Sequence, residues 1–185
     1  RNIHKNKKSK RVITFAAFRG ILLGMTNKLK IGWREWVGLP EFEVAALKAK
    51  VDTGARTSSL HALDPEPFSD RGMSFVRFML LPVQDTLIFG RVVTAPMVDR
   101  RRVTDSGGHW QERYVVHLNI QLGPQLMPIE VTLANRRDMR FRMLLGRQAL
   151  QNVSIDPAES YLLQKTAEQK KFLKEIKAEV MRASK

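Results

Sequence analysis

The chain has 185 residues, of which 43% are apolar, and it contains no cysteine. A chain of this length and composition is expected to form one domain with a sizeable core, flanked by tails. The lack of cysteine excludes disulfide bonds, thiolate catalysis and metal sites with cysteine ligands.

The net charge of +14 would suit a nucleic-acid-binding protein, but the charge is concentrated at the two ends of the chain. Residues 1–30 hold nine Lys/Arg and no acid, and residues 164–185 hold seven Lys/Arg and three acids, whereas residues 31–163 hold 16 bases and 15 acids. The sequence therefore predicts a basic N-terminal extension (1–30, disordered or partly helical), a folded domain (31–163) and a basic C-terminal helix (164–185). We expect no specific nucleic-acid binding, and only weak contacts of the tails with acidic partners or membrane surfaces.

The first element is an apolar stretch at residues 12–25, which Arg19 interrupts. Fourteen residues are too few to span a bilayer. The stretch resembles a signal peptide, but it lacks a small-x-small cleavage site, and an interfacial amphipathic helix is an alternative. The chain does not begin with Met, and Met25 is a candidate start. We expect a cytoplasmic protein, with membrane association or export left open.

Short strands separated by turn residues follow between Ile31 and Leu163. In residues 47–51 Leu47, Ala49 and Val51 alternate with lysines, which is typical of a half-buried strand. Further strands are expected at residues 74–81, 87–98, 114–121 and 129–134, with breaks at Pro65, Pro67, Pro82, 107–108, 123–124 and 135–138. This pattern predicts an all-β barrel or sandwich.

Two helices complete the prediction. A short helix is expected at residues 147–151, directly after Gly146. From Lys165 onward apolar residues recur every three or four positions among charged ones, which predicts an amphipathic helix that docks on the domain or on a partner.

The tetrapeptide Asp52-Thr53-Gly54-Ala55 carries the main chemical signal, because it places a carboxylate on a glycine turn directly after the strand at 47–51. Carboxylates hydrolyse amides in pairs, one taking a proton from water while the other, protonated, donates to the carbonyl oxygen. Gly54 would let the turn close, the Thr53 hydroxyl could bond across it, and Ala55 would let another chain approach. The apolar run that ends at Gly146 would pack beneath the turn.

Four motifs in order carry a resemblance to a known family. They are residues 32–36 (GWREW), 48–58 (KAKVDTGARTS), 128–133 (PIEVTL) and 141–147 (FRMLLGR). They resemble the retropepsins, homodimeric aspartic peptidases of retroviral type, and more closely the bacterial retropepsin-like family often labelled ATP-dependent zinc proteases. The resemblance covers roughly residues 30–163.

The resemblance implies a closed β-barrel of the acid-protease fold, a homodimer with one Asp52 per subunit, and a flap over the cleft. It implies that Asp52 is catalytic and that Thr53, Gly54, Ala55 and Gly146 support it. No cofactor is implied.

Two departures from the viral pattern concern substrate binding. Where viral enzymes have an acid after D-T-G-A, which binds substrate and pairs with the Arg of G-R, this chain has Arg56, so Arg147 must find another partner. Arg56 either anchors an acidic substrate or forms a structural ion pair, and both arginines are candidate substrate-binding residues. The 94 residues from Asp52 to Gly146 exceed the spacing in viral enzymes, so the position of the flap cannot be inferred from theirs.

A second D-S-G, at residues 105–107, follows an arginine-rich stretch rather than a buried strand. We interpret it as a hairpin turn and as the flap candidate. His4, His61, His109 and His117 form no H-E-x-x-H motif, and no phosphate-binding loop or G-x-S-x-G elbow is present, so neither zinc, ATP nor serine catalysis is expected.

The leading hypothesis is an aspartic endopeptidase-like hydrolase that acts on peptides or proteins as a homodimer. The alternatives are a non-catalytic β-barrel that binds an extended peptide or partner, and a zinc-dependent peptidase. The expected oligomer follows from the single credible motif, since one chain supplies one of the two carboxylates.

Overall fold

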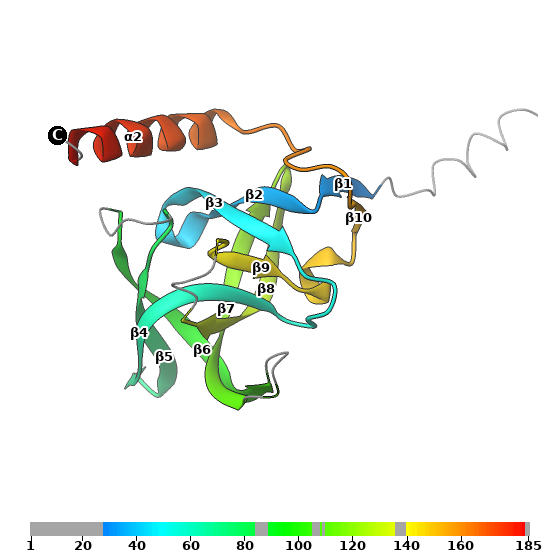
Figure 1. The fold of residues 1–185 in the computed structure, drawn as a ribbon. Coiled ribbons are helices and arrows are strands. Elements are labelled where there is room, and N and C mark those ends of the chain that lie inside the picture. The colour runs from blue at the N-terminus through cyan, green and yellow to red at the C-terminus, as the bar shows by residue number, and fades with distance from the viewer. Residues whose placement is uncertain (1–27, 84–88, 105–107, 109, 136–139, 184–185) are drawn as a thin grey trace, which may run out of the picture.

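The computed structural model describes residues 28–83, 89–104, 108, 110–135 and 140–183. These residues form mainly β-strands, with one long helix at the C-terminal end (Figure 1). The expected all-β fold with a C-terminal helix is confirmed. In the described ranges no helix has the length and apolar content needed to cross a bilayer.

The elements of the described residues run as follows along the chain: β1 (Leu29–Gly32), β2 (Arg34–Leu39), the 3-10 helix η1 (Pro40–Phe42), β3 (Val44–Val51), β4 (Ser58–Asp70), β5 (Met73–Leu80), β6 (Arg91–Thr104), β7 (Trp110–Leu122), β8 (Gln125–Ala134), β9 (Met143–Leu145), the 3-10 helix η2 (Arg147–Leu150), β10 (Val153–Asp156) and α2 (Ala167–Ala183).

The main sheet closes on itself. Its strand order is β2-β3-β9-β4-β5-β6-β7-β8, and additional pairings join β2 to β7 and β4 to β8. The path β2-β3-β9-β4-β8-β7 thus returns to β2, which agrees with a closed β-structure. Most neighbours are antiparallel, but β3 runs parallel to β9 and β4 runs parallel to β8. These parallel pairs bring the residues after β3 beside those after β9.

The core lies inside this closed sheet and explains why the strands hold their register. On β7, Val116, Leu118 and Ile120 are buried, while His117 is exposed, so alternate side chains face inward. On β8, Ile129, Val131 and Leu133 are buried on the inward face, whereas Leu126 near the start of the strand is exposed. Burying each such side chain stabilises the fold by roughly 1.5–3 kcal/mol.

Two of the expected breaks are wrong. Pro65 and Pro67 lie within β4 rather than in a loop. The β4–β5 pairing shifts register between Leu63 and Glu66, and Pro65 lies in this bulge, whereas Pro67 pairs with Val76. The turn at residues 123–124 is confirmed, since Gly123 has φ of 56° between β7 and β8. The strand expected at 87–98 is observed as β6, which begins later and continues through the arginines to Thr104.

A buried carboxylate ties the C-terminal part of the domain to its N-terminal strands. Glu35 is fully buried, and its Oε1 accepts hydrogen bonds of 2.8 Å from the backbone N–H groups of Gly32 and Leu162. In addition, β1 pairs in parallel with β10 in a separate two-stranded sheet. The first and last strands of the domain are therefore joined within one subunit.

The helix α2 lies across one side of the main sheet, next to β3 (Figure 1). Its start is fixed by a reciprocal cap: Gln169 N donates to Thr166 Oγ1, and Thr166 N donates to Gln169 Oε1. Ile176 is buried, whereas Met181 is exposed. The helix expected after Lys165 is thus present and docks on its own domain.

Candidate active site

Asp52 is positioned by two strands that come from distant parts of the sequence. β3 ends at Val51, which pairs with Leu145 of β9. The backbone N–H of Asp52 then donates to the Leu145 carbonyl at 2.9 Å. The D-T-G-A loop and the apolar run before Gly146 are therefore in direct contact, as their motifs predict.

The loop wraps its own backbone around the Asp52 carboxylate. Asp52 Oδ1 accepts hydrogen bonds from Gly54 N at 3.2 Å and from Ala55 N at 3.3 Å. Asp52 is half-buried, while Thr53 and Gly54 are exposed. One carboxylate oxygen is thus fixed by the loop, and the exposed tip of the loop leaves room for a second protein surface.

The close approach in this site occurs at Gly146 rather than at Gly54. A Cβ on Gly146 would lie 2.6 Å from the carbonyl carbon of Thr57 and 2.9 Å from the oxygen of Arg56, so no side chain fits there. A Cβ on Gly54 would meet only Asp52 Oδ1, at 3.3 Å. Gly146 is needed because the two segments pack backbone to backbone.

Arg147 and Gln148 bind the backbone of the D-T-G-A loop and of Arg56. Arg147 Nη1 donates to the carbonyl oxygens of Thr53 and Gly54, each at 2.8 Å. The backbone N–H groups of Arg147 and Gln148, free at the start of η2, donate to the carbonyls of Ala55 and Arg56 at 2.9 and 3.0 Å. The Arg147 side chain therefore binds backbone carbonyl groups. In viral enzymes the corresponding partner is an acid, and Arg56 occupies that position here.

Arg56 is exposed, and among the described residues it forms no ion pair with a carboxylate. Its positive charge nevertheless contributes to lowering the pKa of Glu130 on β8. Glu130 is close in the sheet because the next residue, Val131, pairs with Ser58. The Arg101 guanidinium donates to Glu130 Oε2 at 2.7 Å and holds the pKa of Glu130 below its ordinary value, with smaller contributions from the charges of His117 and Arg56. Arg101 also binds Asp99, and this hydrogen bond lowers the pKa of Asp99.

A family model described as RimB-like, retropepsin-like aspartic endopeptidase RimB, matches residues 30–166. The chain belongs to this family. The match contains the D-T-G-A loop and the G-R segment described above, and it bears out the retropepsin-like resemblance of the sequence.

Two curated relatives of this RimB-like chain are named probable alpha-L-glutamate ligase. The protein from Shewanella pealeana is 44% identical over 138 residues, covering 74% of this chain and 30% of the relative. The protein from Parasynechococcus marenigrum is 39% identical over 142 residues, covering 75% of this chain and 30% of the relative. The chain thus spans about a third of the length of these relatives.

One solved structure is similar over almost its whole length. It is Lpg0085 of Legionella pneumophila, a protein of unknown function, with 30% identity and a TM-score of 0.63. The match covers 74% of this chain and 98% of that protein.

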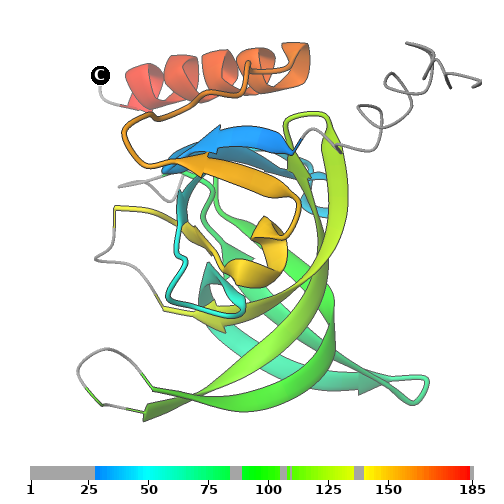
Figure 2. The same ribbon diagram turned by 90° about the vertical axis from the view of Figure 1, so that its right-hand side faces the viewer.

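The β6–β7 hairpin of this RimB-like chain extends away from the side that α2 covers (Figure 2). Its flap candidate, residues 105–107, lies outside the described residues, but Thr104 pairs with Trp110 on either side of it. The arginine-rich stretch before it is strand, as part of β6, but exposed.

Arginine–aromatic pairs lie along this hairpin, and they were not predicted from the sequence. Arg100 lies over Tyr114 at 4.8 Å, and Arg102 lies over Trp110 at 4.3 Å from the ring centre. Trp110 is 60% exposed. The available signal was arginines before the turn and aromatics after it. Arg100 pairs with Tyr114, but Arg102 pairs with Glu112 and reaches Trp110 diagonally, so these contacts depend on the hairpin register.

The histidines give no metal site in the part of the chain that the structure describes, where no three His, Cys, Asp or Glu side chains come together. His117 is exposed on β7, and His61 is buried on β4. His4 and His109 lie outside the described residues.

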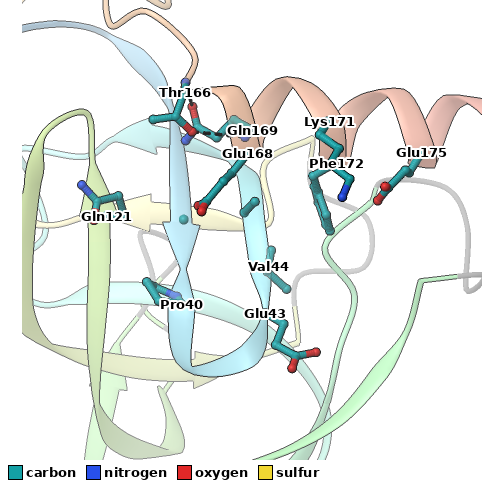
Figure 3. A pocket seen from close by; sticks show the side chains of 12 residues that line it. Pro40, Glu43, Val44, Gln121, Thr166, Glu168, Gln169, Lys171, Phe172 and Glu175 are labelled. Atoms are coloured by element: carbon teal, nitrogen blue, oxygen red, sulfur yellow. Dashed lines mark hydrogen bonds between the residues drawn. The ribbon is translucent and has the colours of Figure 1, made fainter.

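A cavity of about 440 Å³ lies between α2 and the β2–β3 region (Figure 3). Asp52 is not among the residues that line it. The side chains of Glu168 and Phe172 point from α2 toward the sheet, and Pro40 and Val44 line the opposite side. Its lining residues include neither the D-T-G-A loop nor the G-R segment.

Proposed function

We propose that the chain is an aspartic endopeptidase-like hydrolase that cleaves peptide bonds as a homodimer, with a water activated by the Asp52 residues of both subunits. The observation that carries the proposal is the half-buried Asp52 carboxylate, held by two backbone N–H groups on a loop that the G-R segment supports. Membership of the RimB-like family supports the reaction type.

The mechanism needs two carboxylates around one water. The ionised carboxylate takes the proton of the attacking water, while the protonated one donates to the substrate carbonyl. Two like charges about 3 Å apart do not both ionise, so such a pair shares a proton. One subunit supplies one Asp52, and the exposed Thr53 and Gly54 form the surface at which a second copy would place its own loop. The chemistry requires no cofactor.

The site favours an acidic peptide as substrate. Arg56 is exposed four residues after Asp52, and Arg100 and Arg102 extend along the hairpin expected to cover the cleft. Guanidinium groups bind carboxylates through paired, charge-assisted hydrogen bonds. Relatives that contain this domain are named for ligation of glutamate. A glutamate-rich peptide is therefore the substrate class that we propose.

The substitution Asp52→Asn tests the proposal, with the exposed Asp70→Asn as a control for loss of an acid. We expect Asp52→Asn to lower turnover of glutamate-rich peptides by on the order of 1000-fold or more, while Asp70→Asn leaves it unchanged. Circular dichroism and sedimentation should show an intact fold and dimer in both variants. Full residual activity in Asp52→Asn would end the aspartic mechanism, and a wild-type monomer that binds peptides without cleaving them would favour the non-catalytic binding module.

A further inference from the structure

Two consecutive peptide groups of the catalytic loop lie between Arg147 and Asp52. In the peptide group that joins Thr53 to Gly54, the carbonyl oxygen accepts from Arg147 Nη1 at 2.8 Å and the N–H donates to Asp52 Oδ1 at 3.2 Å. In the next peptide group, the Gly54 carbonyl accepts from the same Nη1 at 2.8 Å, and the Ala55 N–H is shared between the same Oδ1 and the Asp52 backbone carbonyl, each at 3.3 Å. Each peptide dipole thus runs from one guanidinium nitrogen to one carboxylate oxygen.

This arrangement aligns charge and dipole at both ends. A cation at the carbonyl end and an anion at the N–H end both favour the same orientation of a peptide dipole. Hydrogen bonds in such a chain polarise one another, so the N–H groups of Gly54 and Ala55 become stronger donors. Two donors on one oxygen fix the carboxylate plane, and the other oxygen remains to face the water.

We infer that Arg147 is a positioning residue for the reaction, holding Asp52 through the two intervening peptide groups without touching it. The inference rests on the proposed function and gives Arg147 a defined part in it. The positioning role depends on the two hydrogen bonds from Nη1. The hydrogen bonds from the backbone N–H groups of Arg147 and Gln148 would remain after substitution of the Arg147 side chain.

The experiment uses Arg147→Met, Arg147→Lys and the control Lys50→Met on the full chain. Lys50 is exposed two residues before Asp52, so its loss removes the same charge near the site without a contact to the loop carbonyls. For Arg147→Met we expect kcat to fall on the order of 10- to 100-fold, as for a small misplacement of a catalytic group, with KM changed less than about twofold. In Arg147→Lys a single ammonium can reach both carbonyls, so at least half of the loss, on a logarithmic scale, should be restored.

A second readout does not depend on turnover. In amide NMR spectra, the N–H resonances of Gly54 and Ala55 should shift in Arg147→Met in the direction of weaker hydrogen bonds, and Lys50→Met should leave them in place. Unmoved resonances in a folded Arg147→Met, or in Arg147→Ala should the methionine variant not fold, would overturn the inference. An equal fall of kcat in Lys50→Met would also overturn it. A wild-type protein without Asp52-dependent hydrolysis would instead overturn the proposed function, so the two failures are distinct.

Discussion

The hydroxyl of Ser58 accepts a hydrogen bond from the backbone N–H of Gly146, with Oγ and N 3.1 Å apart. Ser58 begins β4, three residues after the D-T-G-A tetrapeptide ends, and Gly146 begins the turn into η2. Both are buried, so neither group can turn to water instead. The contact therefore joins the two motifs of the site at the point where they pack most closely.

Removing this hydroxyl should destabilise the domain. Ser58→Ala leaves the Gly146 N–H buried without an acceptor, which costs about 1–3 kcal/mol. We expect the free energy of unfolding, measured by urea titration, to fall by that amount, and peptidase activity to fall with it because the loop loses its support.

Ser59→Ala is the matched control, since Ser59 is also buried but its Oγ has no hydrogen-bond partner among the described residues. Its loss should change the free energy of unfolding by less than about 0.5 kcal/mol or raise it slightly, because an unpaired buried hydroxyl is itself unfavourable. Equal losses in both variants would show that the Ser58–Gly146 hydrogen bond carries no particular energy.

The sequence contained enough to predict the centre of this site. Asp52 follows an alternating strand, and Gly146 follows an apolar run. Such local patterns predict a turn after a buried strand without any knowledge of the tertiary fold. The sequence predicted that the apolar run packs beneath the turn, and the parallel pairing of β3 with β9 brings the two segments together as expected.

The remaining features depend on contacts that local patterns do not encode. Pro65 and Pro67 indicate a loop by composition, but both lie in β4, Pro65 in a bulge and Pro67 paired with Val76. Arg147 was expected to need a partner, yet only coordinates identify the Thr53 and Gly54 carbonyls as that partner. Ser58 is one of several serines, and its hydrogen bond spans 88 positions of sequence.

The Arg101–Glu130 pair gives stability that depends on pH. The hydrogen bond and charge of Arg101 hold the pKa of Glu130 below its unfolded value, so the contribution is present above that unfolded value. It is lost as pH falls through the lower, folded pKa. Glu130→Gln removes the contribution, so we expect the variant to be less stable than wild type at pH 7 by about 1 kcal/mol or less, with the difference shrinking as pH falls below the ordinary pKa of glutamate.

Urea titrations of both proteins across this pH range measure the difference, and Arg101→Met combined with Glu130→Gln isolates the pair as a double-mutant cycle. The coupling between the two substitutions should be present at pH 7 and should weaken as pH falls through the folded pKa of Glu130. A difference between wild type and Glu130→Gln that stays constant across the range would assign the effect to packing rather than to the charge.

Arg56→Ala tests the acidic-substrate proposal. Because Arg56 is exposed and forms no ion pair in the described part of the chain, its guanidinium can meet a substrate carboxylate without first breaking an internal contact. We expect kcat/KM for a glutamate-rich peptide to fall roughly tenfold, which corresponds to about 1.4 kcal/mol, and kcat/KM for a neutral peptide to change less than about twofold. The selective loss should shrink at high salt, since exposed charges are screened.

Arg182→Ala on α2 is the control, because it removes the same charge from another element. It should leave the ratio of kcat/KM for the two peptides unchanged. Equal losses of kcat/KM on both peptides in Arg56→Ala would rule out the anchoring role.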